Sequence, residues 1–256
     1  MDENRRLILK TLASSSAALA CVSACSTKST QEIITGQSSI SDDWQQAQRI
    51  RDAITLPYFA DNTFDVRDFG AINDGFFDCT SAINNAVKVC HTEGGGMVLV
   101  PSGIYKTGAI HLLSNVNLHL EEGATLSFST NPKHYLPEVL TRWEGLEMMG
   151  YSPLIYAYQQ ENIAITGKGI IDGNGDNKTW WPWKGKHKEA HWNLIPGEDQ
   201  KPARDKLMED AENGVAVSDR HYSEGAFLRP PFVQPYACKN VLIEDITIKV
   251  ITDKLL

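Results

Sequence analysis

Three short strand patterns in this chain begin with the same two-residue lead-in, and this repeat constrains the fold more than any other feature. Asparagine followed by valine or isoleucine stands at residues 115–116, 162–163 and 240–241, and each pair opens an alternating strand, a turn and a second strand. Strands this short cannot bury an apolar face alone, but stacked coils can pair them in parallel at about 4.8 Å. The sequence therefore predicts an all-β solenoid, a parallel β-helix. Strand spacing alone also allows a β-sandwich.

A helix is predicted before the repeat, over residues 80–90. Its apolar side chains recur at helical spacing, and the glycines at 94–96 end it. Such a helix would cover the first coil, whose unpaired strand edge and apolar interior would otherwise invite aggregation. Just before the helix, residues 64–70 alternate apolar and polar side chains, which predicts a half-buried strand.

The first residues have the pattern of an export signal rather than of a structural element. Arg5 and Arg6 resemble a twin-arginine signal, and the weakly apolar stretch over 7–19 is too short to span a membrane, which takes about 20 apolar residues. Small residues before Cys25 resemble a lipobox, so Cys25 is predicted to be the lipidated N-terminus of a periplasmic or outer-membrane lipoprotein. An ordinary cleavage site with an incidental cysteine is the alternative.

The rest of the chain divides into two predicted parts after a leader at 1–25. Residues 26–43 are rich in Ser, Thr and Gln and predict a flexible tether. Residues 44–256 predict the β-helix domain, which opens with a short helix from residue 44 to 54. Within it, the tryptophan-rich stretch at about 174–228 breaks the strand pattern and is too long for an ordinary loop, which predicts a functional insert or lid.

The net charge and the cysteine positions argue against nucleic-acid binding, a disulfide and a zinc site. A formal net charge of -8 argues against nucleic acid, and binding of an anionic polymer would need a local basic patch. Cys79 and Cys90 lie about 16 Å apart along a helix, beyond disulfide reach, so free thiols are predicted there. No CxxC pair suggests a zinc site. We expect no metal, no cofactor, a monomer, and membrane contact only through the lipid anchor.

Four motifs resemble those of one enzyme family. Residues 64–71 resemble the opening motif of pectin-active β-helix enzymes, which viral tailspike proteins share, and residues 120–126 are similar to the second coil of polygalacturonases. The Gly-Lys-Gly-Ile-Ile-Asp-Gly run at 167–173 and the Arg-Pro-Pro-Phe-Val-Gln run at 229–234 are more specific to that family. The chain therefore resembles the polygalacturonase-like glycoside hydrolases of family 28, in their bacterial branch, over about 60–249.

The resemblance implies a right-handed parallel β-helix and inverting hydrolysis of α-1,4-galacturonide bonds in pectic polysaccharide or oligogalacturonide. Inversion takes one carboxylic acid to protonate the leaving oxygen and one carboxylate to activate water, about 6.5–9.5 Å apart. In the family these aspartates lie in Asn-x-Asp and Asp-Asp motifs, with Gly-His-Gly and Arg-x-Lys further along. By the resemblance, all of them belong to coils after the one that ends at Lys249.

This sequence departs from the family after Lys249, where residues 250–256 stand in place of the expected Asn-Ser-Pro continuation. We therefore expect a β-helix truncated at its C-terminal end, an inactive N-terminal portion in which no residue is catalytic. A genuine short family member is the alternative. Short motif matches at 174–176, 42–43 and 204–206 lie outside the coils that carry the chemistry, so none of them is assigned a role.

The candidate substrate-binding residues lie in the insert and at its end. Arg229 can grip a galacturonate carboxylate through two nitrogens, and Trp183 and Lys184 can contribute an aromatic face and a cation. A structural arginine paired with an acid, a buried tryptophan anchor and a solvated lysine are the alternatives. For Trp180 and Trp181 packing is favoured over sugar binding.

Two other classes of protein compete with the hydrolase. One is a non-catalytic chain on the same scaffold, such as a pseudogene product or a binding module. The other is a β-helix pectin lyase, which would use calcium and an arginine base, or a tailspike-type carbohydrate-binding protein. The Ile-Asp-Gly and Arg-Pro-Pro-Phe motifs favour the hydrolase.

Overall fold

The computed structural model describes residues 38–186 and 192–249, which belong to two compact units whose boundary in the sequence lies between residues 53 and 54. In the first unit, α2 runs Ser38–Ala53, so the helix predicted from Trp44 begins earlier, inside the stretch predicted to be a tether. The added residues, 38–43, are mainly Ser and Asp, which favour the N-terminal end of a helix. Cys25 and the rest of the leader lie outside the described residues. None of the described helices is long and apolar enough to cross a membrane.

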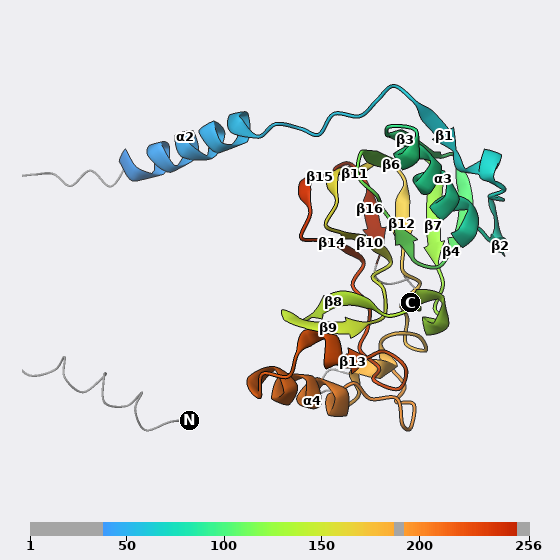
Figure 1. Cartoon of the computed structure of the whole chain (residues 1–256), viewed down its shortest axis with the longest axis vertical. Helices are drawn as coiled ribbons and strands as arrows, with labels where there is room; N and C mark the ends of the chain where they lie inside the picture. Colours follow the sequence, from blue (N-terminus) through green and yellow to red (C-terminus); the bar gives the residue numbers. More distant parts are fainter. Residues whose placement is uncertain (1–37, 187–191, 250–256) are drawn as a thin grey trace, which may run out of the picture. The chain divides into compact units, whose positions relative to one another are not determined.

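The second unit is a parallel β-helix whose successive coils stack into three sheets (Figure 1). The first sheet contains β1 (Thr63–Asp65), β3 (Gly96–Val100), β6 (Val116–Leu120), β11 (Glu161–Gly167) and β15 (Lys239–Ile243). The second contains β2 (Asp74–Asp78), β4 (Gly103–Thr107), β7 (Ala124–Phe128), β12 (Ile170–Asp172) and β16 (Thr247–Lys249). The third contains β5 (Ile110–His111), β10 (Ile155–Tyr158) and β14 (Val233–Tyr236). Every strand pair in these sheets is parallel, which excludes the β-sandwich.

Alternating side chains of each strand fill the interior of the β-helix. Strands β3, β6 and β7 share one pattern in which alternate residues are buried. The parallel register then stacks apolar residues of successive coils on one another. Val98 lies over Leu118 and Leu118 over Ile165, and all three are buried. Burial of branched apolar residues contributes about 1.5–3 kcal/mol each, and a single strand could not provide such burial alone.

The repeated asparagine lead-in forms a hydrogen-bonded ladder along one corner of the β-helix. Asn115, Asn162 and Asn240 all adopt left-handed backbone conformations, with φ of 65°, 54° and 51°. Asn162 donates from Nδ2 to Oδ1 of Asn115 at 3.2 Å, and Asn240 donates to Oδ1 of Asn162 at 2.9 Å. Asparagine tolerates this conformation and supplies both a donor and an acceptor, which explains its recurrence at the same point of each coil.

Helix α3 (Thr80–Thr92) closes the N-terminal end of the β-helix, as the sequence predicts. Its buried face contains Ala82, Ile83, Ala86, Val87 and Cys90. Asn84 ties it to the first coils by donating to the carbonyl of Ala109 at 2.9 Å. The thiols of Cys79 and Cys90 are free and buried, and burial raises the pKa of Cys90 to about 11.

The strand predicted over residues 64–70 is wrong in its second half. Strand β1 ends at Asp65, and the 3-10 helix η1 (Val66–Phe69) follows. The Asp65 carboxylate accepts a hydrogen bond from the backbone amide of Arg67 at 2.9 Å and so caps this turn. An alternating pattern cannot reveal such a local side-chain cap.

A small lobe stands beside the β-helix (Figure 1). It consists of the antiparallel hairpin β8 (Val139–Trp143) and β9 (Leu146–Gly150), the helix α4 (Lys201–Glu212) and the strand β13 (His221–Tyr222). The lobe has its own apolar core, which consists of Trp143, Met148, Leu207, Tyr222, Ala226 and Leu228. Tyr156 of β10 fixes the hairpin to the β-helix by donating to the Leu140 carbonyl at 2.6 Å.

The lobe contains an ion pair that should make its stability depend on pH. The Glu138 carboxylate lies 2.5 Å from Nδ1 of His221, and this hydrogen bond raises the pKa of His221 above its usual value. The contact therefore stabilises the fold fully below the usual histidine pKa of about 6.5 and is lost as pH rises through the raised value. We expect the unfolding midpoint of His221→Gln to fall below that of the wild type at about pH 6 and to match it at about pH 9. A difference that is equal at both pH values would contradict this assignment.

Candidate functional site

A pocket of about 320 Å³ lies where the lobe meets the β-helix. It is bounded by the end of β12, the segment before β14, the tip of the β8–β9 hairpin and the start of the insert. The lining residues are Arg142, Trp143, Glu144, Leu154, Gly173, Gly175, Trp180, Trp181, Arg229, Pro230, Pro231 and Phe232. The pocket thus combines apolar walls with a few charged groups, as small-molecule sites usually do.

Arg229 is the polar centre of this pocket. Its guanidinium lies over the ring of Trp181, 5.5 Å from the ring centroid, and Trp181 in turn stacks on Trp192 at 5.9 Å. In the described part of the chain, Nε of Arg229 is buried and makes no hydrogen bond. Burial lowers the pKa of Arg229, and the nearby charge of Glu144 partly offsets this effect. Burying a donor without a hydrogen-bond partner costs free energy. An anionic ligand that accepts a hydrogen bond from this nitrogen would remove that cost.

The β8–β9 hairpin supplies the other charges of the pocket. Its turn is formed by Glu144 and Gly145, whose φ values of 46° and 95° suit a tight hairpin turn. Arg142 stands at the same tip and covers the ring of Tyr236 of β14 at 5.3 Å. With Arg142 and Arg229 against one carboxylate, from Glu144, the lining residues carry a net positive charge in a protein of formal charge -8. This pocket is therefore a local basic site of the kind that an anionic ligand requires.

Close packing at the floor of the pocket explains why the last residue of the Ile-Asp-Gly motif, Gly173, is a glycine. A Cβ placed on Gly173 would lie 2.4 Å from the ring of Phe232. Phe232 is held there because its carbonyl accepts a hydrogen bond from the amide of Ile155 at 2.9 Å. Glycine at this position lets the Arg-Pro-Pro-Phe segment lie directly against the end of β12.

The structure places only one of the predicted substrate contacts in the pocket. Arg229 lines it, whereas Trp183 is 8% exposed, packs against Tyr151 and donates from Nε1 to Glu198 at 3.1 Å. Trp183 is therefore a buried anchor of the insert. Lys184 does not line the pocket, and its ammonium lies 5.9 Å from the ring centroid of Trp192.

Sequence reasoning missed several pocket residues. Trp180 and Trp181, for which packing was favoured, both line the pocket, and Trp180 also donates from Nε1 to the Gly173 carbonyl at 3.2 Å. Arg142 and Glu144 went unnoticed because the hairpin that carries them was not predicted. Its Glu-Gly turn between two apolar runs was the available signal.

Two of the short matches to catalytic motifs, at 174–176 and 204–206, take part in local structural contacts. Asp176 accepts hydrogen bonds from the amides of Lys178 and Thr179 and so holds a turn. Asp205 lies on α4 and pairs with Lys201 and Arg204. In residues 38–186 and 192–249 no group of three or more His, Cys, Asp or Glu side chains could hold a metal ion. The lining residues include one carboxylate, Glu144, where inverting hydrolysis takes two.

Comparisons with known proteins agree with this fold. No family model matches the chain. The exo-poly-α-D-galacturonosidase of Dickeya chrysanthemi is 31% identical over 72% of this chain and 32% of the relative, and a probable polygalacturonase of Vitis vinifera is 31% identical over 71% and 35%. The solved exopolygalacturonase of Thermotoga maritima is 44% identical, with a TM-score of 0.75 over 80% of this chain and 45% of that structure.

These matches cover only part of the relatives. The chain spans about a third of the length of the two curated relatives and less than half of the Thermotoga structure. The neighbouring structures are right-handed parallel β-helices. The chain is accordingly a member of the polygalacturonase-like glycoside hydrolase family, family 28.

Proposed function

We propose that this protein takes part in the inverting hydrolysis of α-1,4-galacturonide bonds in pectin and that its pocket at Arg229 holds a galacturonate carboxylate. The observation that carries the proposal is the buried, unpartnered Nε of Arg229 at the centre of a positively charged pocket. A guanidinium can bind a carboxylate through two parallel hydrogen bonds, and the Arg229 guanidinium lies over the Trp181 ring. Family membership supplies the reaction type.

We further propose that this pocket binds substrate without cleaving it. Support comes from the pocket, in which Glu144 is the lone carboxylate among the lining residues. One carboxylate cannot act as acid and base on opposite faces of the same bond. Asp176 and Asp205 are engaged in a turn and in ion pairs, so neither supplies the missing partner.

Purified chain should therefore bind trigalacturonate without releasing reducing sugar from polygalacturonate. Calorimetry measures the binding, and a reducing-sugar assay measures the cleavage, with the Thermotoga exopolygalacturonase as the active control. Turnover clearly above the uncatalysed rate would contradict the proposed inactivity. Cleavage without measurable binding at Arg229 would contradict the assigned pocket as well.

We also propose that the protein is exported and anchored by a lipid on Cys25. Support comes from the arginine pair, the short apolar stretch and the small residues before Cys25, which together have the layout of a lipoprotein signal. Expression in a bacterial host with labelled palmitate should label the wild type and leave Cys25→Ala unlabelled. Equal labelling of both proteins, or of neither, would overturn the anchor.

A further inference from the structure

The turn of the β8–β9 hairpin contains a residue that does not suit its backbone conformation. Trp143 and Leu146 are register partners, so the turn consists of Glu144 and Gly145, which both have positive φ. Two-residue turns of this kind favour Asn, Asp and Gly, because most other side chains strain the left-handed conformation. Strain of this sort is retained mainly at functional sites. Glu144 is therefore a candidate for a functional role that an asparagine at this turn could not fill.

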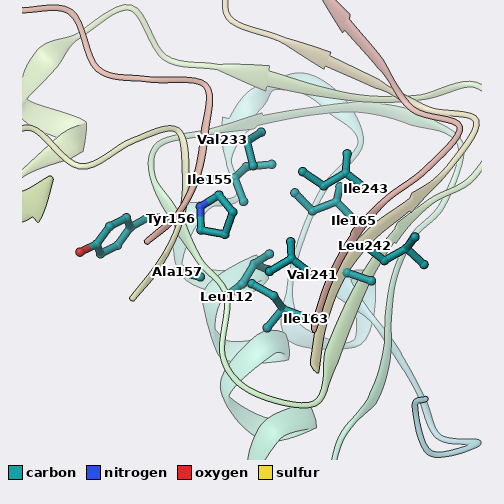
Figure 2. A pocket seen from close by; sticks show the side chains of 12 residues that line it. Leu112, Ile155, Tyr156, Ala157, Ile163, Ile165, Val233, Val241, Leu242 and Ile243 are labelled. Carbon is teal, nitrogen blue, oxygen red and sulfur yellow. The ribbon is translucent and has the colours of Figure 1, made fainter. Parts of the chain in front are cut away.

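The hairpin that carries Glu144 is tied to the third sheet of the β-helix. Figure 2 shows the Tyr156 ring pointing away from the apolar side chains of the interior, and its hydroxyl reaches the Leu140 carbonyl of the hairpin. Thr141 is fully buried and donates to Oε1 of Gln234 at 2.6 Å. Gln234 ends the same Arg-Pro-Pro-Phe-Val-Gln run that Arg229 begins. This run therefore supplies Arg229 to the pocket and also holds the hairpin in place.

The Glu144 carboxylate is available to a ligand. The residue is exposed, lines the pocket and makes no hydrogen bond or ion pair within the part of the chain that the structure describes. The guanidinium of Arg142 next to it covers the ring of Tyr236 instead. Burial lowers the pKa of Arg229, and the charge of Glu144 partly opposes this effect, so the two groups interact across the pocket. A ligand there meets an unpartnered donor on Arg229 and free acceptors on Glu144.

The chemistry of these two groups restricts which parts of a sugar acid each can bind. An ionised carboxylate only accepts hydrogen bonds, so Glu144 repels a ligand carboxylate and attracts hydroxyl groups. Arg229 has only donors and binds the ligand carboxylate. A pocket of about 320 Å³ lies at the small end of the range for small-molecule sites, about 300–1,000 Å³. A single sugar ring bound there lies within reach of both groups.

We propose that Glu144 is a specificity-determining residue of this pocket, and that its carboxylate accepts hydrogen bonds from ring hydroxyls of the galacturonate whose carboxylate Arg229 holds. This inference rests on the proposed function of Arg229. Glu144 then selects sugar acids with free hydroxyl groups over other carboxylates of the same charge. It also disfavours ligands that place a second negative charge on its side of the pocket.

Two ligands of equal charge test this role. One is galacturonate, and the other is tetrahydropyran-2-carboxylate, which has the ring and carboxylate of a uronic acid without its hydroxyls. Both would be titrated into the full chain, with the indole N–H signals of Trp180 and Trp181 in NMR spectra giving Kd. Glu144→Gln should weaken galacturonate binding at least about fivefold, because charge-assisted hydrogen bonds become neutral ones. The same substitution should tighten binding of the hydroxyl-free ligand about twofold, because it removes a repulsion.

Two further variants serve as controls. Glu147→Gln removes the same charge from the same hairpin, and because Glu147 does not line the pocket both Kd values should stay unchanged. Glu144→Asn places a residue that tolerates the left-handed conformation at the turn, so it should keep or raise the unfolding midpoint and still weaken galacturonate binding.

The outcomes separate the role of Glu144 from that of Arg229. If Glu144→Gln leaves galacturonate binding unchanged, or weakens both ligands equally, the role of Glu144 is overturned. The proposed function survives that result when Arg229→Gln weakens both ligands. If Arg229→Gln weakens neither ligand, or if neither ligand binds the wild type, the proposed function fails and this inference fails with it.

Discussion

Replacing Arg229 with glutamine should weaken the binding of trigalacturonate at least about tenfold. A hydrogen bond to a charged group contributes about 1.5–3 kcal/mol, and about 1.4 kcal/mol corresponds to a factor of ten in Kd. Glutamine keeps a hydrogen-bond donor and much of the side-chain length but removes the charge and the planar fork of donors. Calorimetric titration of the purified chain gives the change directly.

The control for this substitution is Arg204→Gln. Arg204 lies on α4, pairs with Asp205 and does not line the pocket, so its loss should leave binding unchanged. Because Nε of Arg229 lacks a partner, Arg229→Gln should leave the unfolding midpoint unchanged or raise it slightly. Equal binding by both variants would show that the galacturonate carboxylate lies elsewhere.

Replacing Gly167 with alanine should prevent the chain from folding stably, with a loss of more than about 4 kcal/mol. A Cβ on Gly167 would lie 2.1 Å from the carbonyl oxygen of Leu120, which is backbone of the adjacent coil and cannot move aside alone. The residue also has a φ of 99°, which an alanine rarely adopts. Thermal unfolding followed by circular dichroism measures the effect.

The variant Gly70→Ala separates the cost of the left-handed backbone conformation from the cost of the close contact with Leu120. Gly70 has a φ of 94°, but a Cβ on this residue would have no neighbouring atom within 4 Å, so alanine there meets only the cost of a left-handed conformation. That cost is about 1–2 kcal/mol. If Gly167→Ala were no more harmful than Gly70→Ala, the close contact between the coils at Leu120 would be contradicted.

The stacked coils could be predicted from the sequence because their determinants are local and repeated. The lead-ins at Asn115, Asn162 and Asn240 mark the same corner of successive coils, and the alternating strands after them supply the interior. Helix α3 was predicted for the same reason, since its apolar residues recur with helical periodicity. Each of these signals lies within a single short element.

The pocket was harder to predict because its residues come together only in three dimensions. Arg142 and Glu144 line the same pocket as Arg229 but lie on a hairpin far away in the sequence. No periodic pattern in the sequence predicts that these residues come together. For Trp183, the tryptophan-rich sequence around it suggested a sugar-binding aromatic face. In the structure, Trp183 packs against Tyr151 and Phe227 and is buried. Whether an aromatic residue binds a sugar or anchors a loop depends on neighbours that the local sequence does not reveal.

A crystal structure of the chain with trigalacturonate would test the central claim most directly. We predict one galacturonate carboxylate within hydrogen-bonding distance of the Arg229 guanidinium, in the pocket between the β8–β9 hairpin and the end of β12. We also predict that no pair of carboxylates flanks a glycosidic bond at the separation of about 6.5–9.5 Å that inversion requires. A ligand bound away from Arg229, or a glycosidic bond flanked by two such carboxylates of this chain, would contradict the account.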